Sequence, residues 1–435
     1  MLKKLADRFG QSLLKRRRRF QKIFPFLKHF HPAYIFGFIL LFIMTMRFVI
    51  FPSFVLLERY VRTSIEEALG YTLVPYSVEV AFVVLVVATI FTARKKIRRH
   101  LKAQPIKGET MQAMIYETYG EPEVFHATLL KKPKQGRDEL LVKIVATAVT
   151  TGDINMRGFV YVPHGLKWIA RVMLGFKRPK KELIGHVFSG VVEAVGAGVK
   201  AFKVGDEVFG MESSGTGTYA HYKTIAHDKP VVLKPATVTH EEAASVLFGA
   251  MTALHFFQKA KLSAGQSVLI NGASGSVGSA AVQIAKAWGM YVTAVCSTSH
   301  IDGVRNLGAD EVIDYTQTDI HQEGKTYDVV LNTVVAQGDF DSFHTLLKPK
   351  GTYIAIAGGL KDMLRPLWGV LRGQKIVAGP SAETKELLEQ IASMLIEGSL
   401  VPVVDPQVFP LEALAQAHRH AQSKARRGTV VVRVA

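Results

Sequence analysis

The chain has 435 residues, enough for two or three domains with substantial cores, and 48% of them are hydrophobic. Its net charge of +18 is unevenly distributed: residues 1–107 carry 20 Lys/Arg against 5 Asp/Glu, and the remaining residues carry 34 against 31. Because the main body is nearly neutral, we expect no nucleic-acid binding. The single cysteine, Cys296, excludes an intrachain disulfide and a cysteine-rich zinc site.

Two apolar stretches near the N-terminus predict membrane-spanning helices. Residues 33–51 and 71–91 each contain one charged side chain, and about 20 helical residues span the hydrocarbon core of a bilayer. Basic clusters at 15–22 and 93–102 flank the pair, so the positive-inside rule places both flanks in the cytoplasm. We therefore expect residues 1–107 to form a two-span anchor in the lipid bilayer of a bacterial inner membrane, with both termini and the catalytic domains cytoplasmic.

Other interpretations of this segment remain open. Residues 1–30 are rich in arginine and contain one acidic residue, as a mitochondrial transit peptide does, so a mitochondrial membrane is the alternative location. The uninterrupted apolar run at 80–91 is also short enough to be a buried core helix.

A different pattern begins at residue 108. Strand-like runs at 140–149, 189–195 and 206–210 are punctuated by Gly, Asp and Pro, which predicts an antiparallel β region. From about residue 234, apolar strands alternate with amphipathic helices. That alternation predicts an α/β fold with a doubly wound parallel sheet and right-handed crossovers.

Three glycines at a spacing of three mark a candidate phosphate-binding turn. Gly272, Gly275 and Gly278 follow a predicted strand at 267–271 and open a predicted helix at 277–289. Glycine lets the backbone approach a pyrophosphate, and the helix N-terminus supplies free N–H groups and a positive dipole end. A turn that binds nothing is the alternative, but the surrounding βαβ pattern favours a dinucleotide site.

The end of the second predicted strand indicates which dinucleotide binds. An NAD site usually has Asp or Glu there to bind the ribose hydroxyls. This chain has CSTSH at 296–300 and no acid before Asp302. Small hydroxyl groups and a histidine suit a 2′-phosphate better, so we expect NADPH to be the cofactor.

Several motifs in a fixed order resemble one known family. GASGSVGSAAVQIAKAWG is followed by LGADEVIDY (307–315), and SGVVEAVGAGVKAFKVGDEVFG (189–210) by GTYAHY (217–222). In this combination they resemble the zinc-free quinone oxidoreductase branch of the medium-chain dehydrogenase/reductase superfamily. The likeness extends from about residue 111 to residue 435 and leaves the N-terminal segment uncovered.

The resemblance implies a domain organisation. A GroES-like β domain would occupy residues 108–233 and be completed by residues 402–435. A Rossmann NADPH-binding domain would occupy residues 234–401, and the active site would lie between the two domains. A homodimer is among the expected assemblies.

The resemblance also implies cofactor-binding residues. Those expected at the pyrophosphate are Ser274, Gly275, Ser276, Val277 and Gly278. Those expected near the 2′-phosphate are Ser297, Thr298, His300 and Tyr315. Those expected at the nicotinamide half are Thr252, Ala357 and Gly358.

Two positions depart from the family pattern. His300 stands where relatives often have Lys or Arg, and Thr429 stands where they often have Lys. Arg426 or Arg427 is a candidate to supply the missing positive charge.

No metal is expected. Zinc-dependent relatives bind zinc through the histidine of a GHE segment, which corresponds to His186 in GHVFSG, but the position of their first cysteine ligand is Thr150. We therefore interpret His186 as a packed or hydrogen-bonding histidine. The resemblance places Thr150 and Asp153 in the segment lining the active site, with Tyr219 near it, and these three are the candidate catalytic residues. A structural cap is the alternative role for Asp153.

The sequence predicts a membrane-anchored reductase that transfers a hydride from NADPH to a quinone or an α,β-unsaturated carbonyl without zinc. Residues 159–185 are the expected substrate lid, and the substrate is expected to be a hydrophobic small molecule. The alternatives are an aldehyde or alcohol oxidoreductase that uses NADP, and a catalytically idle NADPH-binding scaffold that senses redox state.

Overall fold

The chain consists of two compact units, Met1–Pro105 and Ile106–Ala435. All residues that the structure describes belong to the second unit. The computed structural model describes residues 108–160, 162, 167–213, 215, 217–321, 324–334, 339–356 and 373–435. The predicted membrane spans at 33–51 and 71–91 therefore lie outside the described residues. Within the described ranges, no helix combines the length and hydropathy that crossing a membrane requires.

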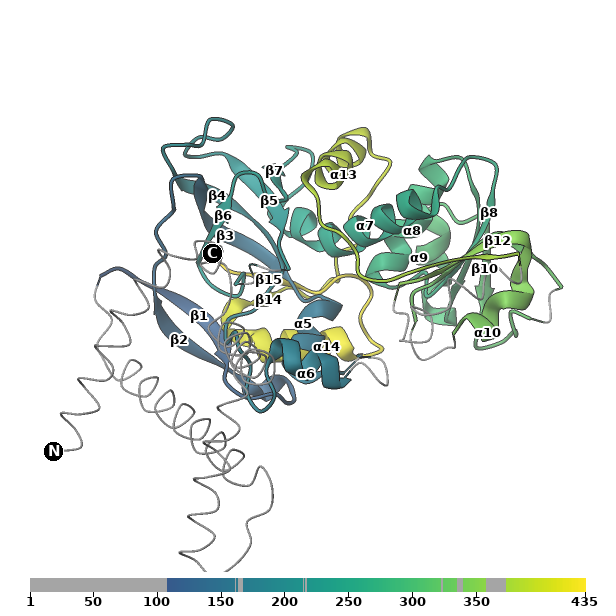
Figure 1. Cartoon of the computed structure of the whole chain (residues 1–435), viewed down its shortest axis with the longest axis horizontal. Helices are drawn as coiled ribbons and strands as arrows, with labels where there is room; N and C mark the ends of the chain where they lie inside the picture. Colours follow the sequence, from purple (N-terminus) through teal and green to yellow (C-terminus); the bar gives the residue numbers. More distant parts are fainter. Residues whose placement is uncertain are drawn as a thin grey trace, which may run out of the picture. The chain divides into compact units, whose positions relative to one another are not determined.

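A seven-stranded sheet forms one side of the described unit (Figure 1). Its strands run in the order β14-β15-β3-β4-β5-β7, and β6 pairs with β3. All pairs are antiparallel except β14 with β15. The strands are β3 (Glu139–Ala148), β4 (Val187–Val195), β5 (Glu207–Met211), β6 (Tyr222–Ala226), β7 (Val231–Leu233), β14 (Phe409–Pro410) and β15 (Val431–Arg433). A separate hairpin pairs β1 (Thr110–Tyr116) with β2 (Phe125–Lys131).

A six-stranded parallel sheet forms the other side (Figure 1), which confirms the predicted parallel sheet. Its order is β10-β9-β8-β11-β12-β13. The strand of this sheet that comes first in the sequence, β8, therefore lies in the middle, beside β11. Dinucleotide-binding sheets have this order, with the ligand at the point where the strand order reverses. The strands are β8 (Ser267–Asn271), β9 (Tyr291–Cys296), β10 (Glu311–Asp314), β11 (Tyr327–Asn332), β12 (Leu347–Ala355) and β13 (Lys375–Ala378).

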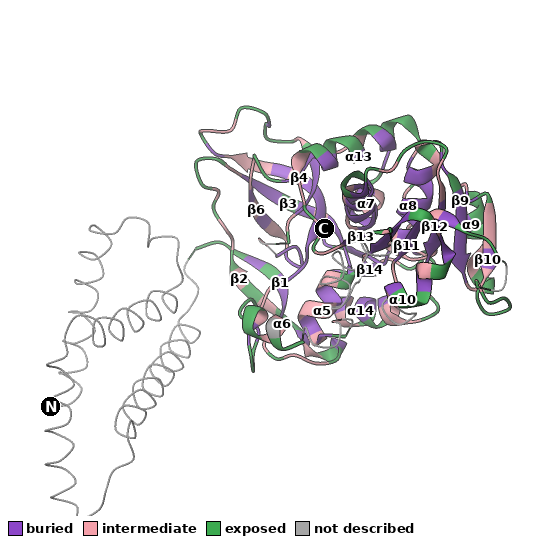
Figure 2. Cartoon of the chain, turned by 45° about the vertical axis from the view of Figure 1, so that its right-hand side comes forward, coloured by how far each residue is buried: buried purple, intermediate pink, exposed green. Residues whose placement is uncertain are grey.

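Helix α7 (His240–Ala260) connects the two sheets. Thr239 and Glu242 form a capping box at its start, and most of its residues are buried (Figure 2). It packs against β3, β4 and β5 on one side and against α8 (Ser276–Ala287), β12 and β13 on the other.

The other described helices are α5 (Thr151–Gly158), α6 (Lys167–Leu174), α9 (Ile301–Asn306), α10 (Phe340–Phe343), α13 (Lys385–Glu397) and α14 (Leu414–Gln422). Short 3-10 turns lie at η2 (Pro122–Val124), η3 (Thr298–His300), η5 (His344–Leu346) and η6 (Leu411–Ala413).

One apolar core runs through the junction of the two sheets. Ala148 of β3 and Phe209 of β5 belong to the same buried cluster as Leu247 of α7 and Ile270 of β8. Because burial of apolar surface is the main favourable term in folding, this shared core fixes the two sheets relative to each other. Residues from either side can therefore contribute to one site.

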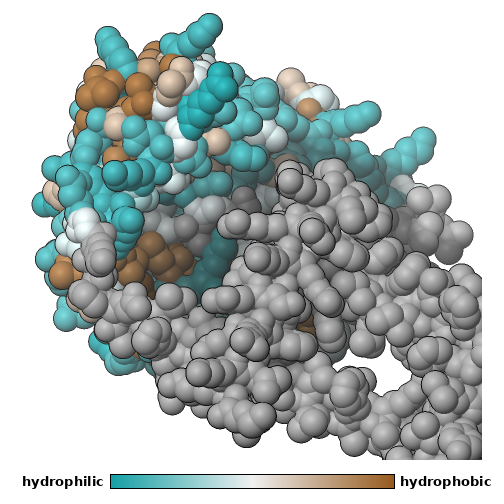
Figure 3. Space-filling model, turned by 60° about the vertical axis from the view of Figure 1, so that its left-hand side comes forward, coloured by the Kyte–Doolittle hydropathy of each residue, from teal (hydrophilic) through white to brown (hydrophobic). Residues whose placement is uncertain are grey.

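The described part of the predicted lid has an apolar exposed surface. In α6, Trp168 and Met173 are 66% and 69% exposed, and Phe176 after the helix is 57% exposed. Such exposure contrasts with the hydrophilic side chains that cover most of the described surface visible in Figure 3. Its function as a lid stays a prediction.

Candidate active site

The glycine turn after β8 is packed closely against the start of α8. Gly272 has φ +81, in the left-handed region that favours glycine. A Cβ atom on Gly278 would lie 2.2 Å from the Gly272 carbonyl oxygen and 2.7 Å from the Cα of Ala273. Only glycine at position 278 therefore allows the first turn of α8 to lie on the loop that precedes it.

Gly275 has a different role from Gly278. It is the N-cap of α8, and a Cβ atom there would meet the Gly272 carbonyl oxygen at 3.3 Å, which the fold tolerates better. No side chain caps this helix, so its first N–H groups stay available to an anion. Val277 packs its side chain against the core, and its binding of a cofactor through the backbone stays a prediction.

Residues of this turn meet a residue from the far C-terminus. The Ser276 hydroxyl accepts a hydrogen bond from the Thr429 hydroxyl at 3.4 Å. Thr429, where relatives often have Lys, therefore lies at the predicted pyrophosphate site. Ser274, in the same turn, is half-buried.

The predicted 2′-phosphate residues gather where β9 ends. Ser297 precedes the 3-10 turn that holds Thr298 and His300, and the backbone N–H of Tyr315 donates to the Cys296 carbonyl at 3.2 Å. Nδ1 of His300 lies 3.3 Å from the Ser297 hydroxyl, while Nε2 lies 3.3 Å from the carbonyl oxygen of Arg426. The histidine thus connects the predicted phosphate site to the C-terminal segment.

The residues expected at the nicotinamide half are only partly described. Thr252 lies on α7, where its hydroxyl donates to the Phe248 carbonyl at 2.7 Å within the helix. Ala357 and Gly358 lie outside the described residues. Sequence reasoning missed Thr333, whose hydroxyl donates to the Asn271 carbonyl at 2.8 Å and lies beside Gly272, where the strand order reverses.

Thr150 and Asp153 form a capping box at the start of α5. The Asp153 carboxylate accepts bonds from the Thr150 N–H at 2.9 Å and from the Thr150 hydroxyl at 2.7 Å, and the Thr150 hydroxyl accepts from the Asp153 N–H at 3.2 Å. The structure therefore shows the capping role that was the alternative for Asp153. Their catalytic roles stay predictions.

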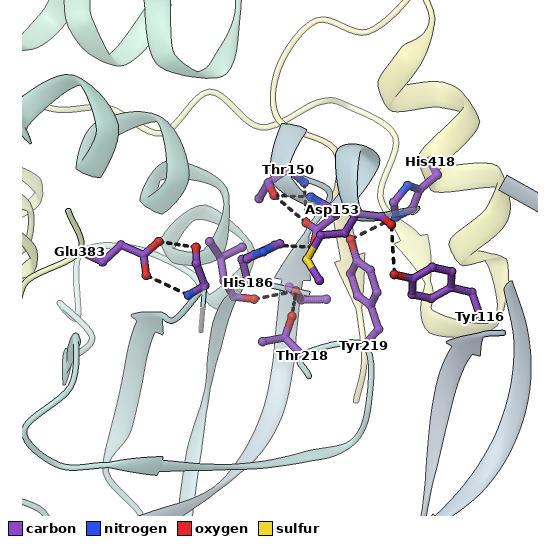
Figure 4. Close-up of polar contacts among 12 residues, drawn as sticks. Tyr116, Thr150, Asp153, His186, Thr218, Tyr219, Glu383 and His418 are labelled. Carbon is purple, nitrogen blue, oxygen red and sulfur yellow. Dashed lines mark hydrogen bonds and ion pairs between the residues drawn. The ribbon is translucent and has the colours of Figure 1, made fainter. Parts of the chain in front are cut away.

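Asp153 has a second partner, His186 (Figure 4). Nδ1 of His186 lies 2.6 Å from Oδ1 of Asp153, and both side chains are almost fully buried. Burial alone would raise the pKa of Asp153, but the neighbouring His186 charge and hydrogen bonds from His186 and Thr150 lower it. Burial would likewise lower the pKa of His186, and Asp153 raises it instead. Each partner thus favours the charged form of the other, carboxylate for Asp153 and imidazolium for His186.

Tyr219, the third candidate, is fully buried in the β-domain core. Its hydroxyl lies 3.1 Å from Nε2 of His418 (Figure 4). Both rings pack on Phe125. Burial and the nearby Asp153 charge raise the pKa of Tyr219 well above 10, and burial lowers the pKa of His418 to about 3. Both groups are therefore neutral, and Tyr219 is enclosed by core residues. No sequence signal pointed to His418, since it lies on a helix with no motif.

Comparison with known proteins agrees with this architecture. The profile "Alcohol dehydrogenase GroES-like domain" matches residues 136–236, and "Zinc-binding dehydrogenase" matches residues 307–432. The protein "NAD(P)H oxidoreductase RTN4IP1, mitochondrial" of Mus musculus is 31% identical over 372 residues, 77% of this chain and 92% of the relative. The chain belongs to the medium-chain dehydrogenase/reductase superfamily.

Further members of the superfamily are similar in sequence or structure. "NADPH-dependent alkenal/one oxidoreductase, chloroplastic" of Arabidopsis thaliana is 29% identical over 333 residues, 74% of this chain and 79% of the relative. The solved quinone oxidoreductase from Coxiella burnetii has a TM-score of 0.66 and 23% identity, covering 75% of this chain and all of that chain, which shows the shared fold. The protein is therefore an NAD(P)H-dependent oxidoreductase of the quinone/enone reductase type, and its cofactor is NADPH.

The predicted location was wrong. The similar enzymes of Mus musculus and Arabidopsis thaliana are named as mitochondrial and chloroplastic, which overturns the placement of a two-span chain in a bacterial inner membrane. In the part of the chain that the structure describes, there is also no helix suited to spanning a bilayer.

The zinc that many members of the superfamily bind does not fit this site. Thr150 replaces the first cysteine ligand, and its hydroxyl proton is donated to Asp153. Asp153 in turn holds Nδ1 of His186. Among the described residues, no group of three or more His, Cys, Asp or Glu side chains could hold a metal ion. The donor set therefore suits a hydrogen-bonded pair rather than a metal centre, and the expected lack of zinc stays a prediction.

We expect the enzyme to bind NADPH at least tenfold more tightly than NADH, about 1.4 kcal/mol. The backbone carbonyl of Arg426 lies 3.3 Å from Nε2 of His300, which makes the Arg426 guanidinium a candidate cation for the 2′-phosphate. Arg426→Ala should reduce the preference and leave NADH affinity unchanged, because NADH lacks that phosphate. Fluorescence titration of both nucleotides measures this. The exposed Arg419→Ala is the matched control, and an unchanged preference in Arg426→Ala would contradict the assignment.

Proposed function

We propose that this enzyme reduces a quinone or an α,β-unsaturated carbonyl with NADPH and without zinc. The observation that carries the proposal is that Asp153 holds both the Thr150 hydroxyl, at the position of the relatives' first cysteine ligand, and Nδ1 of His186, at the position of their histidine ligand. The relatives support the same substrate class, since the Arabidopsis enzyme is named for alkenals and alkenones and a Solanum lycopersicum relative is "2-methylene-furan-3-one reductase".

The proposed chemistry follows from a site without a strong Lewis acid. Oxidising a simple alcohol requires stabilisation of a localised alkoxide, which zinc supplies in many dehydrogenases. A conjugated acceptor spreads its negative charge over an enolate or a quinol. Hydrogen-bond donors stabilise such a delocalised charge without a metal. Bound NADPH supplies the hydride, while the chain positions the two reactants and excludes water.

The chain has suitable residues for two parts of NADPH, the pyrophosphate and the 2′-phosphate. The uncapped start of α8 and the Ser276 and Thr429 hydroxyls would hold the pyrophosphate. Ser297, Thr298 and Arg426 would hold the 2′-phosphate. Each group is a hydrogen-bond donor or a cation, as an anionic ligand requires.

A substrate panel tests the proposal. With NADPH, enones and quinones should give kcat/KM values at least 100-fold above those for saturated aldehydes, and alcohols with NADP should give the lowest values. Steady-state loss of NADPH absorbance measures each rate. Faster turnover of a saturated aldehyde or an alcohol would favour the aldehyde and alcohol oxidoreductase. NADPH binding with no turnover of any acceptor would favour the redox-sensing scaffold.

We also expect the purified enzyme to contain no stoichiometric zinc and to keep full activity in the presence of a chelator. The reason is the donor set, in which the Thr150 hydroxyl takes the place of a thiolate. Metal analysis and enone reduction before and after chelation measure this. One zinc per chain that is lost together with activity in His186→Ala would contradict it.

A further inference from the structure

The mismatch with a zinc site leaves His186 without the role that its position has in zinc-dependent relatives. In those relatives the corresponding histidine binds zinc, and a catalytic zinc ion acts as a Lewis acid on a reacting oxygen. We infer that His186 protonates the enolate oxygen of the substrate, with Asp153 as its positioning residue. This inference rests on the proposed reduction of a conjugated carbonyl.

The geometry assigns different tasks to the two ring nitrogens. Nδ1 is held by Oδ1 of Asp153 at 2.6 Å. Nε2 makes no hydrogen bond with any described residue. This atom is not fully buried, so it keeps some contact with solvent. Asp153 cannot rotate away, because Thr150 holds its other oxygen with two hydrogen bonds. The ring is thus fixed with Nε2 as its free donor.

Gly152 packs closely against the His186 ring. A Cβ atom at this position would lie 3.2 Å from Cε1 of His186, closer than side-chain atoms ordinarily pack. Gly152 therefore borders the edge of the ring that carries Cε1 and Nδ1. The absence of a side chain at this position lets the ring keep its place against Asp153.

The charges around His186 keep its proton in place. Burial lowers its pKa, while Asp153 on α5 and Glu383 raise it, and Lys223 on β6 lowers it. The net direction is upward, so the imidazolium form persists to a higher pH than in a free histidine. Glu383 precedes α13 on the side of the parallel sheet and accepts hydrogen bonds from Ser213, so both sides of the junction contribute to this balance (Figure 4).

Protons and electrons balance in the proposed reaction. The β-carbon of the enone gains a hydride with its electron pair, and the C=C electrons move to form the enolate, whose oxygen becomes negative. The Nε2–H bond of His186 then breaks and an O–H bond forms, leaving a neutral imidazole and an enol. The enol becomes the saturated carbonyl when its α-carbon gains a proton from solvent and its oxygen loses one to solvent. A further solvent proton then restores the imidazolium of His186, so one proton is consumed for each NADPH oxidised. Asp153 stays ionised throughout.

The test compares His186→Gln with His126→Gln, which changes an exposed histidine on β2. With an enone, His186→Gln should lower kcat by about 100-fold or more, the scale of general acid catalysis, with NADPH affinity within twofold of wild type. The wild-type kcat should fall as pH rises through the raised pKa of His186, and this dependence should vanish in His186→Gln. His126→Gln should match wild type in both respects.

A second measurement does not depend on turnover. NMR titration of the histidine rings in wild-type protein without NADPH should show His186, assigned by its loss in His186→Gln, titrating above the ordinary value of about 6.5. Asp153→Asn should lower that pKa. A wild-type value at or below 6.5 overturns the inference, even if a variant fails to fold. Enone reduction by wild type with an unchanged kcat in His186→Gln overturns it too and leaves the proposed function intact, whereas failure of wild type to reduce any enone or quinone overturns both.

Discussion

Gly275→Val should weaken NADPH binding at least 100-fold, about 2.7 kcal/mol, and leave the folded structure intact. A Cβ atom at this N-cap meets the protein only at 3.3 Å, so the fold can accept it with a small adjustment. The valine methyl groups would instead occupy the space over the start of α8 where the pyrophosphate approaches. Fluorescence titration measures the affinity, and thermal unfolding measures the fold.

Two other glycines provide controls for this variant. Gly278→Ala should destabilise the protein by about 1–3 kcal/mol, because its Cβ atom would overlap the backbone of Gly272 and Ala273. Gly303→Ala should be neutral or slightly stabilising, because nothing lies within 4 Å of the added atom on α9. Loss of thermal stability in Gly275→Val equal to that in Gly278→Ala would show that Gly275 serves packing rather than the cofactor.

Asp153→Ala should lower the free energy of unfolding by about 3–5 kcal/mol. The substitution removes the carboxylate that pairs with the buried His186, and breaking one partner out of a buried ion pair leaves the other charge uncompensated. It also removes half of the capping box at α5. Urea unfolding at constant pH measures the loss. Asp153→Asn keeps the shape and hydrogen-bonding groups, so its loss should be smaller.

The stability cost of Asp153→Asn should depend on pH in a defined window. The lowered pKa of Asp153 contributes stability above its unfolded value of about 3.9, and this contribution is lost as pH falls through the folded pKa. The raised pKa of His186 contributes stability below about 6.5, and this is lost as pH rises through the folded pKa. The cost should therefore be largest between about pH 4 and 6.5. A cost independent of pH would show that Asp153 acts only as a cap.

The parallel sheet and the glycine turn could be predicted from the sequence because their signals are local. The spacing of Gly272, Gly275 and Gly278 after an apolar strand defines a turn whose geometry depends on neighbouring residues, and the structure confirms its place between β8 and α8. The antiparallel β region was likewise indicated by strand-like runs, although its completion by the C-terminus came from the family resemblance.

The role of the catalytic candidates could not be predicted, because it depends on contacts between distant segments. Nothing in the sequence near Tyr219 shows that it is enclosed by Phe125 and His418, which come from opposite ends of the domain. The sequence favoured a hydrogen-bonding role for His186 but could not name Asp153 as its partner, 33 positions away. The contact between His300 and Arg426 also joins segments that no local pattern connects.

The position of β15 has a consequence for how the protein is made. This strand follows every other described strand in the sequence, and it pairs with β3, with Val431 opposite Ala148. All six strands of the parallel sheet are synthesised earlier, so that half can fold as a unit while the β domain still lacks its closing strand. Until β15 has been synthesised, residues 146–148 of β3 lack a partner on the edge where β6 pairs with residues 139–143, and this short edge is open to pairing with other nascent chains. A stop codon just before Thr429 would leave that edge open permanently and would remove the hydroxyl beside Ser276 as well.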